Sequence, residues 1–168
     1  HHTPRIAGAA ADAHRLPALD IALREGDHFT IGTAVGDVID VSGHTLGHIA
    51  VHFPGSSVVF TADSLMAAGC GRLFEGTPDQ MFASLAKLRA LPPETLICSG
   101  HEYTTSNLTF AATVDPQNEA LQARIAKVTK AKADVGKFDA DVVRWQSKVK
   151  RLTGLVAQRV VDHAIESY

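Results

Sequence analysis

Two histidines four residues apart, His44 and His48, lie in the stretch GHTLGH at residues 43–48. Such a pair binds zinc on one face of a helix when a glutamate follows the first histidine and acts as a base. Here glycines flank and interrupt the stretch, and no glutamate follows His44. We therefore predict a strand-to-turn connection, on which the two imidazoles need not point the same way.

Two further candidate ligands, Asp63 and His101, follow predicted strands at residues 58–61 and 95–98. Loops at strand ends often carry functional side chains, so these two residues and His44 are expected to converge. Imidazole and carboxylate together suit zinc, iron or manganese better than calcium or magnesium. Each residue alone has a simpler explanation as a surface or hydrogen-bonding group. Together the three predict a metal site.

The elements that would position these side chains are short strands followed by helices. The strands are β-branched or aromatic-rich runs bounded by glycine, proline and serine, and the turn at residues 54–57 predicts a hairpin. Thr77, Pro78 and Gln80 form a capping box that predicts the start of a helix, which ends before Pro92. The predicted strands are residues 29–31, 38–41, 49–53, 58–61 and 95–98.

Helical patterns dominate after His101. Residues 108–113 and 116–129 are predicted helices, and residues 142–160 place valine, leucine and tryptophan at helical spacing. We predict an α+β protein with a main domain at residues 1–103 and a C-terminal helical region at residues 104–168. Within the first predicted helix, the apolar stripe comprises Met81, Leu85, Leu88 and Leu91.

Composition sets limits on the class of protein. The 168 residues are 45% hydrophobic and 20% charged, within the globular range, and Cys70 and Cys98 form no disulfide framework. No apolar run reaches the ~20 residues of a membrane span, and no signal peptide precedes the domain, so we expect a cytoplasmic protein with no membrane partner. Residues 124–159 carry ten basic and three acidic residues, against six and fifteen elsewhere. With only Phe138 and Trp145 available for stacking there, we expect no nucleic acid partner.

Three strings, GHTLGH, GCGRLFEGTP at residues 69–78 and GHEYTTSN at residues 100–107, resemble glyoxalase II, the hydroxyacylglutathione hydrolases of the metallo-β-lactamase fold. The resemblance runs from about Arg5 to Val128, roughly three quarters of the chain. It implies an αββα sandwich and hydrolysis of S-(2-hydroxyacyl)glutathione by metal-activated water. The first string is common to the superfamily, whereas the other two are typical of glyoxalase II.

The resemblance also implies a role for each matching position. His44 would bind a first metal, His101 a second, and Asp63, the catalytic carboxylate, would bridge them. The metals would be zinc, with iron or manganese as alternatives. His48 matches a position that binds no metal, so it would have a structural role next to the ligands. The residues implied to line the glutathione pocket are Arg72, Phe74 and Tyr103.

One family motif, a Thr-His-x-His-x-Asp-His loop that precedes the segment beginning near Arg5, does not occur in this sequence. We therefore expect a sandwich that is incomplete at its N-terminus, with an exposed core and an incomplete ligand set. Two rival interpretations stay open. One is a mononuclear iron persulfide dioxygenase, against which the two longer strings argue. The other is a non-catalytic binding module that oligomerises through its C-terminal helix, residues 142–160.

Overall fold

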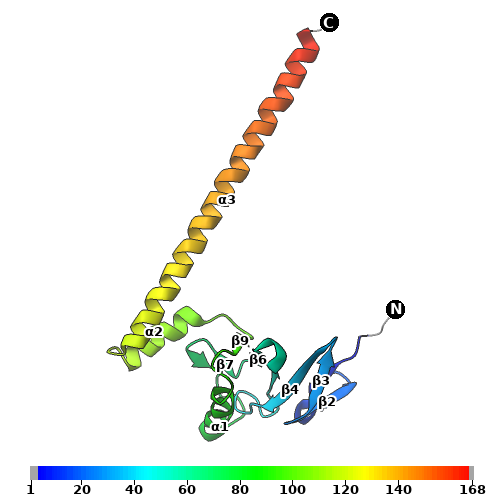
Figure 1. Ribbon diagram of the computed structural model, residues 1–168, viewed down its shortest axis with the longest axis vertical. Helices are drawn as coiled ribbons and strands as arrows, with labels where there is room; N and C mark the ends of the chain where they lie inside the picture. The colour runs from blue at the N-terminus through cyan, green and yellow to red at the C-terminus, as the bar shows by residue number, and fades with distance from the viewer. Residues whose placement is uncertain (1–3, 167–168) are drawn as a thin grey trace. The chain divides into compact units, whose positions relative to one another are not determined.

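The computed structural model describes the backbone of residues 4–166 and the side chains of residues 4–137, 139–140, 142–144 and 146. The chain divides into two compact units, His1–Val114 and Asp115–Tyr168. The first unit contains the strands and two helices, α1 (Pro78–Arg89) and α2 (Thr104–Val114). The second contains the 48-residue helix α3 (Glu119–Glu166), drawn in yellow to red in Figure 1.

A five-stranded sheet in the order β3-β4-β5-β6-β9 forms the centre of the first unit. Its first four strands pair antiparallel, and β9 adds to β6 in parallel (Figure 1). The five predicted strands are confirmed, although β4 begins four residues early because Ala34–Gly36 pair with β3 despite their weak strand pattern. The strands are β3 (His28–Ile31), β4 (Ala34–Asp40), β5 (Ile49–Phe53), β6 (Val58–Ala62) and β9 (Leu96–Ser99).

Sequence patterns did not predict four very short strands and a 3-10 turn. Strands of two or three residues, some made of alanine and glycine, carry no alternation from which a sheet face can be inferred. The first two pair in parallel and the last two form an antiparallel hairpin beside the site described below. They are β1 (Ala7–Ala9), η1 (Ala10–Asp12), β2 (Ile21–Leu23), β7 (Leu65–Met66) and β8 (Gly69–Cys70).

Helix α1 begins with the predicted capping box. Thr77 Oγ1 accepts a hydrogen bond from Gln80 N at 3.2 Å, and Gln80 Oε1 accepts one from Thr77 N at 2.9 Å. Met81 and Leu88 of the predicted stripe are buried. Leu88 packs on one face of the sheet, where it completes the core cluster of Val41, Ala50, Val59 and Leu88.

The other face of the sheet exposes apolar side chains. Phe60 and Leu96 are 51% and 62% exposed, and Phe60 contacts Phe53 edge-to-face with ring centroids 6.0 Å apart. Phe60 alternates with the buried Val59 along β6, so the two side chains point to opposite faces. The sheet therefore leaves apolar side chains exposed on this face.

Helix α2 packs against β8 and belongs to the first unit, which extends to Val114. Asn107 on this helix donates to Ala67 O at 3.0 Å. A Cβ at Gly69 would lie 2.7 Å from Asn107 Nδ2, so glycine leaves the room that this contact needs.

Helix α3 joins the predicted helical segments 116–129 and 142–160 into one, whereas the predicted segment 108–113 belongs to the separate helix α2. Asn118 Oδ1 accepts from Leu121 N at 3.0 Å at its start. Val142, the first residue of the predicted stripe, is exposed, and its side-chain partners from Trp145 to Val160 lie outside the described residues. Self-association through this stripe stays a prediction. Within the part of the chain that the structure describes, no helix has the length and hydropathy that crossing a membrane requires.

Candidate metal and substrate site

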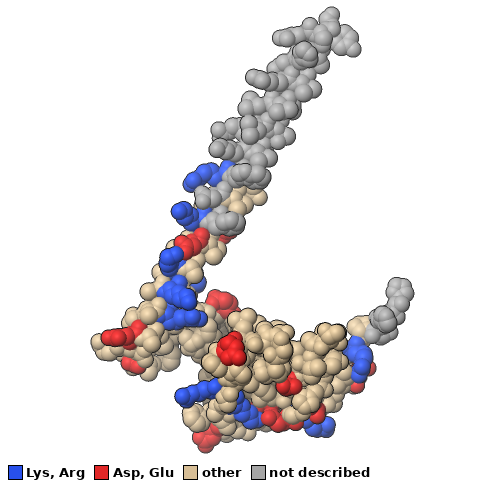
Figure 2. Space-filling view, in the orientation of Figure 1, with Lys and Arg blue, Asp and Glu red and all other residues tan. Residues whose placement is uncertain are grey.

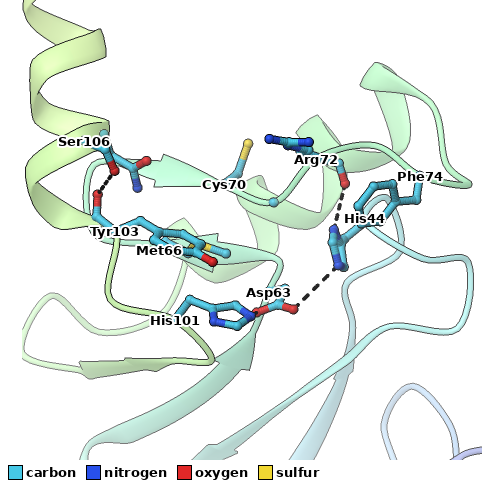
Figure 3. A pocket seen from close by; sticks show the side chains of 11 residues that line it. His44, Asp63, Met66, Cys70, Arg72, Phe74, His101, Tyr103 and Ser106 are labelled. Carbon is cyan, nitrogen blue, oxygen red and sulfur yellow. Dashed lines mark hydrogen bonds and ion pairs between the residues drawn. The ribbon is translucent and has the colours of Figure 1, made fainter.

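A cavity of about 640 Å³ in the first unit brings together residues that are far apart in the sequence. It opens between the turn after β6, the hairpin β7–β8 and the segment that leads into α2 (Figure 3). The six predicted ligand and pocket residues all line it, namely His44, Asp63, Arg72, Phe74, His101 and Tyr103. His48 does not.

Parallel pairing of β6 and β9 explains why Asp63 and His101 meet. The register places Ala62 opposite Ser99, and Gly100 N donates to Ala62 O at 2.8 Å, so both strands end together. Asp63 Oδ1 then lies 3.5 Å from His101 Nε2. A Cβ at Gly100 would lie 2.5 Å from Asp63 Oδ1, which explains the glycine in this position.

The turn that carries Asp63 is anchored by two fully buried hydroxyl groups. Thr61 Oγ1 donates to Leu65 O at 2.7 Å, and Ser64 Oγ donates to Val41 O at 2.9 Å. The first bond closes the turn between β6 and β7, and the second ties the turn to the segment that follows β4, so the Asp63 backbone has little freedom. Sequence reasoning missed both residues, because serine and threonine are common in turns and nothing in their spacing marks them as anchors.

His44 approaches the other oxygen of the same carboxylate, with its Nε2 atom 3.6 Å from Asp63 Oδ2. Its Nδ1 atom lies 2.7 Å from Arg72 O. A carbonyl oxygen only accepts, so Nδ1 carries a proton and Nε2 is the ring nitrogen that faces the carboxylate, where it can offer its lone pair to a metal ion. Two electron-rich atoms at this separation are well suited to share a cation, and a hydrogen bond that fixes the far ring nitrogen is typical of metal-binding histidines.

The described donors suit such a cation only in part. Among the described residues, no three His, Cys, Asp or Glu side chains gather at a single point that would hold a metal. His44 and His101 lie instead on either side of Asp63, each facing a different oxygen. This arrangement is compatible with one ligand for each of two metal positions and a shared carboxylate, which stays a prediction, and the described donors are incomplete for either position.

His48 lies behind the carboxylate and supports it. Its Nε2 atom accepts from Asp63 N at 3.2 Å, and its Nδ1 atom lies 3.0 Å from Thr45 Oγ1. Burial, followed by the neighbouring His44, lowers the pKa of His48, so the ring is neutral near pH 7. A neutral ring that accepts at Nε2 carries its proton on Nδ1 and donates it to Thr45.

Replacing His48 with alanine should therefore lower the free energy of unfolding by about 1–3 kcal/mol, because the Asp63 N–H loses its acceptor. Urea denaturation measures this change. Thr45→Val is the matched control, since it removes the hydroxyl and leaves the Nε2 acceptor in place; it should cost less. Equal losses in the two variants would contradict the assigned role of the Asp63–His48 bond.

An aromatic ring packs against each of the two imidazoles (Figure 3). The Phe74 and His44 ring centroids are 4.9 Å apart, and Tyr103 stacks on His101 at 5.1 Å with an interplanar angle of 13°. Phe74 and Tyr103 are 68% and 50% exposed, so each also offers surface to a ligand. Pocket residues that sequence reasoning did not assign include Met66, Cys70 and Ser106, which reach the cavity from β7, β8 and α2.

Comparisons with known proteins show which proteins this chain resembles. Residues 6–101 match the model of the metallo-β-lactamase superfamily, and residues 102–138 match that of the hydroxyacylglutathione hydrolase C-terminus. The hydroxyacylglutathione hydrolase of Ruegeria pomeroyi is 64% identical over 79% of this chain and 52% of its own length. That of Jannaschia sp. is 64% identical over 77% of this chain and 50% of its own. Among solved structures, ETHE1 from Myxococcus xanthus is 31% identical, with a TM-score of 0.53 over 59% of this chain and 43% of that one.

The chain spans about half the length of the curated relatives it matches. The two matched regions meet between residues 101 and 102, close to the predicted domain boundary, whereas the compact unit defined by contacts ends at Val114. The difference is α2, which matches the C-terminal model by sequence and packs with the first unit.

Proposed function

We propose, from the premise that this chain belongs to the metallo-β-lactamase superfamily, that its cavity serves the hydrolysis of S-(2-hydroxyacyl)glutathione to glutathione and a 2-hydroxy acid. One observation carries the proposal. Asp63 presents one carboxylate oxygen to His44 and the other to His101, inside a cavity that Arg72 and two aromatic rings also line. The identity to curated hydroxyacylglutathione hydrolases supports the choice of substrate.

We assign His44, Asp63 and His101 as metal ligands, with zinc as the metal and iron or manganese as alternatives that the same donors suit. A metal ion there supplies a Lewis acid and lowers the pKa of water. The residues themselves hold the geometry. The Arg72 carbonyl fixes the His44 tautomer, and the bond from Asp63 N to His48 fixes the turn that carries the carboxylate.

The cavity wall provides complementary groups for a glutathione thioester. The Arg72 guanidinium suits a terminal carboxylate of the tripeptide, and Phe74 and Tyr103 offer flat apolar surfaces to its backbone. The leaving group is a thiolate, whose conjugate acid has a pKa of about 8.5 in cysteine, so the reaction needs no strong general acid. This agrees with a cavity in which one oxygen of the Asp63 carboxylate faces His44 and the other faces His101.

Turnover of S-D-lactoylglutathione by the purified chain with added zinc tests the proposal. We expect loss of the thioester with release of one thiol per ester, and no oxygen uptake when a glutathione persulfide is supplied with iron. Oxygen uptake without thioester cleavage would identify the persulfide dioxygenase. Neither reaction, in a chain that is folded by circular dichroism, would identify the binding module.

A further inference from the structure

Three segments that are distant in the sequence meet at the carboxylate of Glu75, next to the cavity and outside its lining. Arg15 donates through Nη1 to Glu75 Oε1 and through Nη2 to Oε2, the latter at 3.1 Å. Leu46 N donates to Oε2 at 2.8 Å. Leu46 belongs to GHTLGH, and Glu75 belongs to the loop that carries Arg72 and Phe74. One side chain therefore joins the loop of a predicted ligand to the loop of two predicted pocket residues.

The two loops already run side by side through their backbones. Phe74 N donates to His44 O at 3.2 Å, and Gly76 N donates to Gly43 O at 3.1 Å. A Cβ at Gly76 would lie 2.6 Å from Gly43 Cα, so the contact leaves no space for a larger residue. Glu75 lies between Phe74 and Gly76 in the sequence. Its carboxylate adds a third hydrogen bond between the two loops, from Leu46 N.

Arg15 also links Glu75 to Asp12, which contacts the end of the GHTLGH loop. Its Nη2 atom donates to Asp12 Oδ1 at 2.7 Å. The Asp12 side chain packs directly on Gly47, where a Cβ would lie 2.3 Å from Asp12 Cγ. The loop around His44 is therefore held at Leu46 by Glu75 and at Gly47 by Asp12, with Arg15 bonded to both carboxylates.

We propose that Glu75, clamped by Arg15, is a positioning residue that fixes the loop of His44 so that its Nε2 atom is presented to a metal ion. The inference rests on the proposed function only in taking His44 as a ligand. Glu75 acts through Leu46 N and the backbone bonds of the loop, and it contacts neither the cavity nor Asp63. No part of this connection was predicted from the sequence.

Glu75 is ionised wherever such a site would work. Its hydrogen bonds from Arg15 and then Leu46 lower its pKa to about 2. A carboxyl group whose folded pKa lies below the unfolded value stabilises the fold above the unfolded value, and the contribution is lost as the pH falls toward 2. The hydrogen bonds from Arg15 and Leu46 to the Glu75 carboxylate are therefore intact at neutral pH, where zinc binding is measured.

Glu75→Gln tests the proposal, because the amide keeps the shape and one acceptor and removes the charge that binds Arg15. We expect the zinc affinity, measured by competition with a chromophoric chelator, to fall about tenfold, as for other residues that orient metal ligands. Hydrogen exchange of the Leu46 amide should accelerate in the same variant. Neither readout requires turnover.

Glu25→Gln is the matched control. Glu25 Oε2 likewise accepts from a backbone N–H, that of Asp40, and from a cation, Lys87 Nζ at 3.0 Å, and none of these residues lines the cavity. This control should leave zinc affinity and Leu46 exchange unchanged.

Unchanged zinc affinity in Glu75→Gln, or an equal loss in Glu25→Gln, would overturn the proposal. If the parent chain binds no zinc, the proposed function fails independently. In that case hydrogen exchange of the Leu46 amide alone tests whether Glu75 holds the loop. Faster exchange in Glu75→Gln supports this role, and unchanged exchange overturns it.

Discussion

Asp63→Asn should lower the kcat/KM for S-D-lactoylglutathione about a thousandfold, which corresponds to roughly 4 kcal/mol of activation free energy. Asp63 is the only side chain that faces both His44 and His101 among the described residues, with one oxygen 3.6 Å and the other 3.5 Å from an imidazole nitrogen. The amide keeps the shape of the carboxylate and removes its negative charge, and it turns an NH₂ group toward one of the two rings. Steady-state kinetics of the two proteins measures the loss.

A second Asp–His pair provides the control. Asp37 Oδ1 lies 2.7 Å from His28 Nδ1 on the hairpin β3–β4, and neither residue lines the cavity. Asp37→Asn should therefore keep kcat/KM within about twofold of the parent, as expected for an exposed ion pair away from the site. An Asp63→Asn protein that stays folded and retains more than a tenth of the activity would contradict the assigned role of this carboxylate.

Gly71→Ala should lower the same activity about a hundredfold, because it displaces two groups of the site together. A Cβ at this position would lie 2.2 Å from Asp63 O and 2.8 Å from His44 Nδ1. The loop has to shift, and the shift breaks the bond from His44 to Arg72 O. A displacement of about 1 Å is enough for a hundredfold loss.

Gly55→Ala is the matched control, since a Cβ there meets nothing within 4 Å and the residue lies in the turn between β5 and β6. It should be as active as the parent. Urea denaturation of both variants separates misplacement from unfolding. Full activity in a folded Gly71→Ala protein would show that the close approach of this loop to His44 has no part in the reaction.

Local patterns predicted much of the fold. The capping box at Thr77 and the hairpin turn depend on neighbouring residues only, and both are confirmed. The two strings typical of glyoxalase II predicted the family, which the matches over residues 6–138 confirm. The convergence of His44, Asp63 and His101 was predicted from strand ends and the family resemblance. The parallel register of β6 and β9 explains why Asp63 and His101 meet, and the bond from His44 to Arg72 O orients the third residue.

Contacts between distant segments were beyond such patterns. Arg15 and Glu75 are 60 residues apart, and nothing in their spacing pairs them. Thr61 and Ser64 are residue types that are common in ordinary turns. Only the folded structure shows that their buried hydroxyl groups hold the turn of Asp63 in place. The distribution of charged residues along the sequence did not indicate where the cavity lies either. Figure 2 shows basic side chains gathered along the described part of helix α3 and others on the first unit, while the cavity residue Arg72 stands within an acidic part of the sequence.

Equilibrium dialysis with zinc tests whether His44, Asp63 and His101 bind a metal ion, because its result depends on the ligands and on no choice of substrate. We expect the purified chain to bind zinc. His44→Gln, Asp63→Asn and His101→Gln should each weaken binding at least tenfold, whereas Asp37→Asn should not. Zinc binding that is the same in all five proteins, or absent from the folded parent, would contradict the assignment of these ligands.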